Sequence, residues 1–280
     1  MSVSSIFESK TVHSNDFLED DYEFSGRSAD SRQKLALIVL NGATGFAAEE
    51  MSFLMKRWKG FSVTICADGG ANRLHDAFSA TVKGAEIGSC RPDHIIGDLD
   101  SARSEVLELY KSMGTEVTFV ASQDNNDLEK SLDLVDELRG KGRLKGSGAV
   151  KVVVFGAFGG RFDQEIANCN TLYTYKDKFE SIVLLGGGNS ATLLEGGKHL
   201  EHRIRMVPGK EGPGCALLPL GSPVVSADST GLKWNLTNHA LAIGGLVSSS
   251  NRAEVDQDGK MAEVVVRASS HLLWSCDLRL

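Results

Sequence analysis

The sequence predicts an α/β fold: an N-terminal parallel-sheet domain covered by helices on both faces, followed by a C-terminal antiparallel β-sandwich domain. From Lys34 to residue 190, short runs that are apolar on both faces alternate with helix-like segments. This alternation is typical of a parallel sheet buried between helices. After the Gly-Gly-Gly triplet at 186–188, short strand-like segments separated by Gly, Pro, Asn and Ser replace the helical periods, as in antiparallel β-domains.

The composition is that of a globular protein with room for one or two domains. Of its 280 residues, 41% are hydrophobic and 24% are charged, which is ordinary for such proteins. The net charge of −7 and the absence of a long basic run argue against a nucleic-acid partner. No apolar run reaches the ~18 residues of a membrane-spanning helix, so no membrane partner is expected.

The cysteines indicate a reducing compartment. The chain has five of them, an odd number, far apart and without a C-x-x-C pair, which argues against a disulfide framework and against a zinc knuckle. The N-terminus also lacks the basic and apolar regions of a secretory signal. We therefore expect a cytoplasmic protein.

Three segments are expected along the chain. Residues 1–33 show no sustained period and are predicted to be a largely flexible tail. The α/β domain is assigned to residues 34–190, with expected strands at 35–40, 61–66, 94–96, 117–120, 150–155 and 182–185. Its expected helices are 45–57, 69–79, 102–113, 127–139 and 161–178. The β-sandwich is assigned to residues 191–280, with expected strands at 191–194, 202–207, 215–220 and 262–267.

Polar, glycine-rich loops follow five of the expected α/β strands. They occupy residues 41–45, 68–73, 97–101, 122–127 and 156–164. Each has a plain alternative, because Asp and Gly are common in turns and helix caps. Ligands of open α/β sheets bind at the carboxyl ends of the strands, so five such loops at one edge favour a ligand site.

The residue types in these loops suit phosphate chemistry. Asp98 and Asp100, at i and i+2, point the same way on an extended strand, and with Asp127 they offer the hard oxygens that Mg²⁺ prefers. Glycines let backbone N–H groups approach a polyphosphate, while Lys130 and Arg161 would neutralise a transferred group. Neither G-x-x-x-x-G-K-[ST] nor G-x-G-x-x-G occurs, so a P-loop kinase and a dinucleotide-binding dehydrogenase lose their main support.

Six motifs, in order, resemble the eukaryotic thiamine pyrophosphokinase family. They are Ala67–Leu74, Pro92–Ser101, Gln123-Asp124 with Asp127 and Lys130, Gly159–Gln164, Gly231–Leu236 and Leu246–Asn251. The resemblance implies Mg²⁺-dependent transfer of a pyrophosphoryl group from ATP to the hydroxyl of thiamine, giving thiamine diphosphate and AMP. It also implies a homodimer with each active site between the α/β domain of one subunit and the β-domain of the other.

The resemblance to the family also implies which residues of this chain form the site. The implied catalytic residues are Asp98, Asp100, Asp127, Lys130, Arg161 and Asp163, of which the three aspartates Asp98, Asp100 and Asp127 would hold the metal. The implied ATP contacts are Asp68, Gly69, Asn72, Gly159, Gly160 and Arg161. The implied thiamine contacts are Gln123, Trp234, Ser248 and Asn251. An indole face is the best aromatic partner for the cationic thiazolium, although Trp234 has the alternative of being a core residue of the sandwich.

Other functions remain open at this level. The same carboxylates would serve another Mg²⁺-dependent small-molecule phosphotransferase or a phosphohydrolase, and a non-catalytic thiamine- or nucleotide-binding module is a third possibility. One departure from the family pattern is Asn126, which stands where a threonine often precedes the aspartate of that loop. Asn caps a helix as well as Thr does, so we expect little effect.

Overall fold

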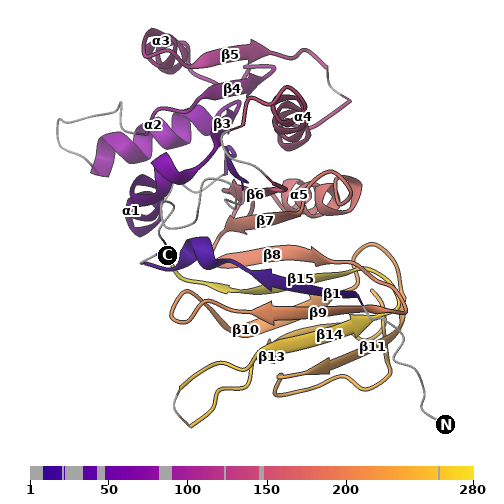
Figure 1. Cartoon of the computed structure of the whole chain (residues 1–280). Coiled ribbons are helices and arrows are strands. Elements are labelled where there is room, and N and C mark those ends of the chain that lie inside the picture. The colour runs from indigo at the N-terminus through magenta and orange to yellow at the C-terminus, as the bar shows by residue number, and fades with distance from the viewer. Residues whose placement is uncertain are drawn as a thin grey trace. The chain divides into compact units, whose positions relative to one another are not determined.

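The computed structural model describes residues 9–20, 22, 34–42, 48–81, 90–122, 124–144, 148–257 and 259–280. They divide into two compact units (Figure 1): an α/β unit that ends at Gly187, and a β unit that joins residues 188–279 to the N-terminal segment up to Tyr22. Within the described residues, no helix has the length and apolar character needed to cross a membrane.

The described part of the α/β unit holds six strands in one parallel arrangement. They are β2 (Lys34–Val39), β3 (Val63–Ala67), β4 (His94–Gly97), β5 (Glu116–Phe119), β6 (Val150–Phe155) and β7 (Ser181–Gly186). Their order is β7-β6-β2-β3-β4-β5, and every pair is parallel. All residues of β3, β4 and β6 are buried. The predicted parallel sheet, apolar on both faces, is confirmed.

Helices lie on both faces of this sheet (Figure 1). They are α1 (Ala48–Arg57), α2 (Gly70–Thr81), α3 (Ser104–Ser112), α4 (Asp127–Gly140) and α5 (Phe162–Thr174). Helix α2 contacts α1 and α3 on one face, whereas α4 contacts α5 on the other and packs against β2, β3 and β4. Because each parallel crossover needs such a helix, the helical segments expected from the sequence appear between the strands.

Helix α4 begins with a capping box. The Asn126 side-chain oxygen accepts a hydrogen bond from the backbone N–H of Glu129 (2.9 Å), and the Glu129 carboxylate accepts one from the N–H of Asn126 (2.9 Å). Two otherwise unpaired donors of the first turn are satisfied in this way. The expectation that Asn126 replaces threonine as a cap is confirmed, and the cap fixes the start of the helix that carries Asp127 and Lys130.

The β unit is a sandwich of two sheets. One contains, in the order β13-β10-β15-β8, the antiparallel strands Ser248–Arg252, Glu211–Leu218, Leu272–Leu278 and Asn189–Leu194. The other has the order β1-β9-β14-β11-β12, in which β1 is Ser9–Ser14, β9 Leu200–Arg205, β14 Val264–Ala268, β11 Val224–Thr230 and β12 His239–Leu241. Leu217, Val264 and Trp274 belong to the apolar core contributed by both sheets, which confirms the predicted β-sandwich.

The prediction of a flexible tail does not hold for residues 9–20. Strand β1 (Ser9–Ser14) pairs in parallel with the edge strand β9, and the following 3₁₀ turn (Asp16–Leu18) buries Phe17 and Leu18. An edge strand offers unpaired N–H and C=O groups, and the two apolar side chains bury surface that the tail alone could not. The other residues of the predicted tail, apart from Tyr22, lie outside the described residues.

Candidate active site

A cavity of about 870 Å³ opens at the carboxyl edge of the α/β sheet. The chain runs outward from β2 through β3 and β4 to β5, and then returns to β6 on the other side of β2. Open α/β sheets bind ligands at such a switch point, where neighbouring loops leave in opposite directions. The residues that line the cavity include Asn41, Asp98, Asp127, Lys130, Gly160 and Arg161.

Three carboxylates meet at this edge. One oxygen each from Asp68, Asp98 and Asp100 lies within 4.8 Å of the others. Asp68 follows β3 and the other two follow the neighbouring β4, so the pairing of these parallel strands brings them together. Among the residues that the structure describes, this is the group of acidic or metal-binding side chains close enough to share a metal ion.

Asp68 is the most constrained of the three. Its backbone has φ 45°, only 2% of the residue is exposed, and its N–H donates to the Ile96 carbonyl (2.9 Å). The carboxylate accepts one hydrogen bond at Oδ2, from the Ser101 N–H (3.3 Å), while the buried Oδ1 has no partner among the described residues. Burial, together with the negative charge of Asp127, raises the pKa of Asp68 to about 6.

Asp127, expected from the sequence to be the third metal ligand, lies in an ion pair instead of in that trio. The ammonium of the buried Lys130 is 3.2 Å from Asp127 Oδ1 and 3.9 Å from Asp98 Oδ2. The two residues are three apart on α4, which places them on the same helix face. Lys130 thus bridges Asp127 and Asp98, the latter a member of the carboxylate group.

Glycines allow the loop after β3 to pack this closely. A Cβ atom at Gly70 would lie 2.2 Å from the Val39 carbonyl oxygen, and one at Gly69 would lie 2.5 Å from the Asn41 side-chain nitrogen. A Cβ at Gly97 would come within 2.8 Å of the Asp68 Cβ. Gly69, expected among the ATP contacts, therefore lies where a larger residue would have to displace the Asn41 side chain.

Asn72 ties the Asp100 loop to α2. Its amide nitrogen donates to the Ser101 carbonyl (2.7 Å), and its amide oxygen accepts from the Arg103 N–H (3.0 Å). Both groups of this expected ATP contact are used within the protein. Asn72 acts here by holding the loop that presents Asp100.

The loop after β6 is shaped by a carboxylate of α5. The N–H groups of Gly159 and Gly160 both donate to Glu165 Oε1, at 2.8 and 2.9 Å. Next to them, Arg161 forms a bidentate ion pair with Asp163 (3.1 and 2.5 Å), in which both side chains are exposed. The guanidinium lowers the pKa of Asp163 by this hydrogen bond. Arg161 lines the cavity, whereas its partner Asp163 is not among the lining residues.

Sequence reasoning missed several residues of the cavity wall. Arg73 donates from Nε to the Asn41 side-chain oxygen (3.0 Å), and both line the cavity together with Glu165 and Asn168. The sequence did contain one signal, because Arg73 closes the same loop as Asp68 and Asn41 follows the first strand directly. Arg73 adds a third cation to Lys130 and Arg161 around this space.

The expected thiamine contacts of the β unit lie together. The buried Asn251 accepts from the Trp234 N–H (3.3 Å) and donates to the Trp234 carbonyl (2.8 Å) and the Ser248 hydroxyl (3.2 Å). Trp234 is 54% exposed, with the Lys233 ammonium 4.6 Å from its ring centre. Trp234 is therefore not a core residue: its backbone is held and its ring is presented to solvent. Gln123 lies outside the described residues.

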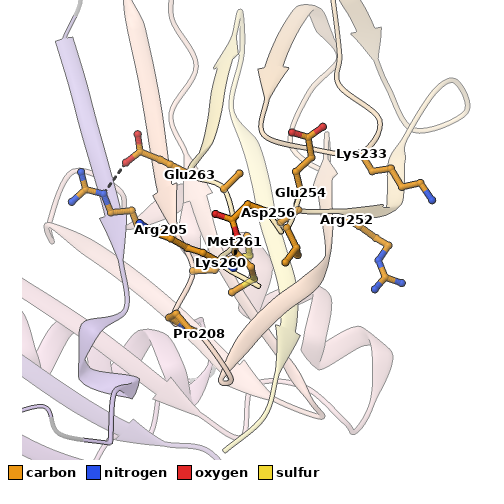
Figure 2. Close-up of a pocket in the computed structure, with 13 residues that line it drawn as sticks. Arg205, Pro208, Lys233, Arg252, Glu254, Asp256, Lys260, Met261 and Glu263 are labelled. Atoms are coloured by element: carbon orange, nitrogen blue, oxygen red, sulfur yellow. Dashed lines mark hydrogen bonds and ion pairs between the residues drawn. The ribbon is translucent and has the colours of Figure 1, made fainter. Parts of the chain in front are cut away.

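A second cavity, of about 930 Å³, belongs to the β unit and involves none of the expected site residues. Figure 2 shows it between the end of β9 and the hairpin of residues 253–262, with the Arg205–Glu263 ion pair (2.7 Å) at one side. Its lining mixes both charges with the methionines Met206 and Met261. This mixture indicates no particular ligand.

Comparison with known proteins assigns the two units to one family. The family model "Thiamin pyrophosphokinase, catalytic domain" matches residues 54–184, and the model "Thiamin pyrophosphokinase, vitamin B1 binding domain" matches residues 201–272. The first covers the strands that present the carboxylates, and the second covers Trp234, Ser248 and Asn251.

Individual relatives agree with the family models. The chain is 34% identical over 249 residues to thiamine pyrophosphokinase 3 of Oryza sativa subsp. japonica, covering 87% of each chain. It is 33% identical over 273 residues to thiamine pyrophosphokinase 1 of Arabidopsis thaliana, covering 96% of this chain and 93% of the relative.

Solved structures share the fold. Yeast thiamin pyrophosphokinase superposes with a TM-score of 0.75 at 20% identity, covering 100% of this chain and 95% of the other. The enzyme from Candida albicans gives 0.71 at 24% identity, covering 88% and 90%. The chain therefore belongs to the thiamine pyrophosphokinase family, the enzymes that produce thiamine diphosphate from thiamine and ATP.

Proposed function

We propose that the chain transfers a pyrophosphoryl group from ATP to the thiamine hydroxyl and releases AMP at the carboxyl edge of the α/β sheet. The observation that carries this proposal is the meeting of Asp68, Asp98 and Asp100 within 4.8 Å beside the switch-point cavity. The donor atoms there are all carboxylate oxygens, which fits the family's divalent metal and Mg²⁺ in particular. Asp98, Asp100 and Asp127 would hold the ion.

The chemistry of this site is positioning and electrostatics. When bound, Mg²⁺ offsets negative charge on the phosphate oxygens. From the protein, Lys130, Arg161 and Arg73 bring positive charge to the same cavity, whereas the N–H groups of Gly159 and Gly160 donate to Glu165. Asp100 or Asp127 would accept the proton of the thiamine hydroxyl, a small contribution because the transition state of phosphoryl transfer is loose.

Thiamine recognition is proposed for Gln123, Trp234, Ser248 and Asn251. The support is the rigid presentation of an exposed indole, whose backbone Asn251 holds from both sides. The Lys233 ammonium over the ring indicates that the ring face attracts a cation, which is the interaction that a thiazolium would make. The buried Ser248 and Asn251 would fix the turn and supply polar groups beside it.

A homodimer is proposed as the working state. On α5, Phe162 is 75% exposed and Ile166 44% exposed, and on the β unit Trp234 and Leu246 are 54% and 49% exposed. A partner subunit that covered these side chains would remove their apolar surface from water. A protein that sedimented as a monomer at assay concentration and was fully active would rule out a shared site.

A cytoplasmic location is also proposed. It is supported by the five cysteines, which are all free thiols, as is usual in a reducing compartment.

The deciding experiment supplies ATP, Mg²⁺ and thiamine, and measures AMP and thiamine diphosphate. We expect the two products in equal amounts, AMP formation that depends on thiamine, and loss of both in Asp98→Asn. ADP as the nucleotide product would indicate an ordinary kinase. Phosphate release without thiamine would indicate a hydrolase, and either result would overturn the proposal.

A further inference from the structure

Two backbone N–H groups in the loop after β6 converge on one carboxylate oxygen. Gly159 and Gly160 both donate to Glu165 Oε1, at 2.8 and 2.9 Å. Successive N–H groups that point at one acceptor form a nest, the backbone arrangement that binds anions such as phosphate. In this chain a side chain of the protein itself takes the place of the anion. Glu165 Oε1 thus lies where a phosphate oxygen would also be bound.

The N–H pair lies beside the cavity proposed for the nucleotide. Gly160, Arg161 and Glu165 line this cavity, and the loop follows β6 at the edge where ligands of such sheets bind. Both glycines are exposed, so their N–H groups can be reached from solvent. Gly159 has φ 94°, a conformation that glycine adopts without strain. The pair is therefore presented to an incoming phosphate with no side chain of its own in the way.

The loop also has anchors that do not involve Glu165. The Ala157 N–H donates to a carbonyl of β7 (2.9 Å), and the Asn168 amide donates to the Ala157 carbonyl (2.9 Å). A Cβ atom at Gly187 would lie 3.1 Å from the Gly159 nitrogen, so the turn after β7 packs closely against the loop. These contacts would keep the N–H pair in place when the Glu165 side chain moves away.

The charge of Glu165 opposes the binding of a polyphosphate. A nucleoside triphosphate brings several negative charges, and like charges in one cavity repel each other. Within the described residues Glu165 forms no ion pair, because the neighbouring Arg161 pairs with Asp163. The Glu165 side chain is half-buried and is held by the two N–H groups. Its departure would therefore leave no buried cation without a partner.

We propose that Glu165 is an internal competitor of the nucleotide. It occupies the N–H pair of Gly159 and Gly160 in the free chain, and a phosphate oxygen of the nucleoside triphosphate displaces it on binding. The role of Glu165 rests on the nucleotide site of the proposed function and adds regulation to that site. Displacing the carboxylate lowers the affinity for the triphosphate, and its return to the N–H pair favours the departure of a bound phosphate group.

The competing explanation is that Glu165 is a permanent part of the loop. In that case the phosphate never contacts the N–H pair, and removing the carboxylate would loosen the loop and weaken nucleotide binding. If Glu165 is a competitor, removing it strengthens nucleotide binding, because the binding-competent form of the loop is then the form already present. The two explanations predict opposite changes of affinity in Glu165→Ala.

The experiment measures binding of α,β-methylene ATP, in which a P–C–P link replaces the bond to be broken, by isothermal titration calorimetry. The full chain is used with Mg²⁺ and without thiamine. Because a hydrogen bond to a charged group is worth roughly a factor of ten in an equilibrium constant, we expect at least about a fivefold lower Kd in E165A. E165Q keeps an acceptor oxygen without the charge and should show a smaller decrease. The control E108Q removes an exposed carboxylate from α3 and should match the parent.

Amide hydrogen exchange provides the second readout. In the parent, the N–H groups of Gly159 and Gly160 have an acceptor with or without nucleotide, so their protection should change little. In E165A they should exchange fast in the free protein and slowly with the analogue bound, because the phosphate then supplies the acceptor. The melting temperature of E165A should stay close to that of the parent, since the other anchors of the loop remain.

Equal or weaker binding of the analogue by E165A would overturn the role of Glu165 alone. So would amides of Gly159 and Gly160 that stay unprotected in E165A with the analogue bound, or an E165A that does not fold. A parent that does not bind the analogue at all would overturn the nucleotide site of the proposed function, and the role of Glu165 with it.

Discussion

The Nε2 atom of His13 lies 2.8 Å from the Nδ1 atom of His202 and joins the edge strand β1 to its neighbour β9. His202 is 3% exposed, and its Nε2 lies 2.7 Å from the Glu195 carbonyl oxygen. A carbonyl only accepts, so Nε2 of His202 carries a proton, and in the neutral imidazole Nδ1 then accepts the proton of His13. Burial lowers the pKa of the His202 imidazole, which favours this neutral form.

Removing this contact should loosen the N-terminal strand. In His13→Ala, Nδ1 of His202 loses its donor, which should lower the free energy of unfolding by about 1–2 kcal/mol. Hydrogen exchange of the β1 amides should accelerate with it. The control is His199→Ala, at an exposed turn before β9, which should leave both unchanged. Parent-like exchange in His13→Ala would show that backbone pairing alone holds β1.

His202 should make the protein less stable as the pH falls below neutrality. The folded pKa of His202 is lowered from its ordinary 6.5, so below that pH the unfolded chain binds a proton that the folded chain binds less readily. The stabilising contribution is complete above about pH 6.5 and is lost as the pH falls toward the lowered folded value. Urea midpoints at pH 7.5 and 5.5 should differ less in His202→Gln than in the parent. An equal difference would exclude His202 as the cause.

The two tryptophans of the β unit should separate binding from stability. Trp234 is exposed, so Trp234→Ala should raise the KM for thiamine roughly 2- to 30-fold, the range of a cation–π contact, and change the urea midpoint little. Trp274 is 3% exposed in the core, so Trp274→Ala should lower the free energy of unfolding by about 3–5 kcal/mol. A parent-like KM in Trp234→Ala would remove Trp234 from the proposed thiamine site.

A methyl group at Gly97 should disturb the carboxylate group. Its Cβ would lie 2.8 Å from the Asp68 Cβ, so Gly97→Ala should cost about 1–3 kcal/mol of stability through overpacking and weaken Mn²⁺ binding by moving Asp68. The control is Gly140→Ala, at the end of α4, where nothing lies within 4 Å. That variant should be neutral or slightly stabilising. Unchanged metal affinity in Gly97→Ala would show that the site tolerates the shift.

The cap of α4 should depend on the side-chain oxygen and not on the residue type. Asn126→Ala removes the oxygen that accepts from the Glu129 N–H and should lower stability by about 1 kcal/mol, whereas Asn126→Thr should match the parent. Urea titration measures both. A loss in Asn126→Thr as large as in Asn126→Ala would mean that the amide has a function beyond capping.

The sequence by itself determined the two architectures and the loops that meet at one edge. Runs such as 150–155 are apolar on both faces because helices cover both faces of the sheet. The sequence pattern therefore predicts their burial directly. Asp98 and Asp100 could be singled out for a similar reason, since two carboxylates beside each other at a strand end are costly without a cation. The capping role of Asn126 is equally local and was predictable from the residue type.

Tertiary structure alone decided what depends on contacts between distant segments. Strand β1 forms because β9 leaves an edge to pair with, because His202 contacts His13, and because Phe17 and Leu18 of the following turn are buried. The sequence of residues 9–20 alone does not reveal these partners. Asp68 joins Asp98 and Asp100 because β3 and β4 are neighbours in the sheet and because a left-handed φ at Asp68 turns its carboxylate. Local patterns report burial and turns, whereas the meeting of Asp68 with Asp98 and Asp100 depends on which strands are neighbours in the sheet.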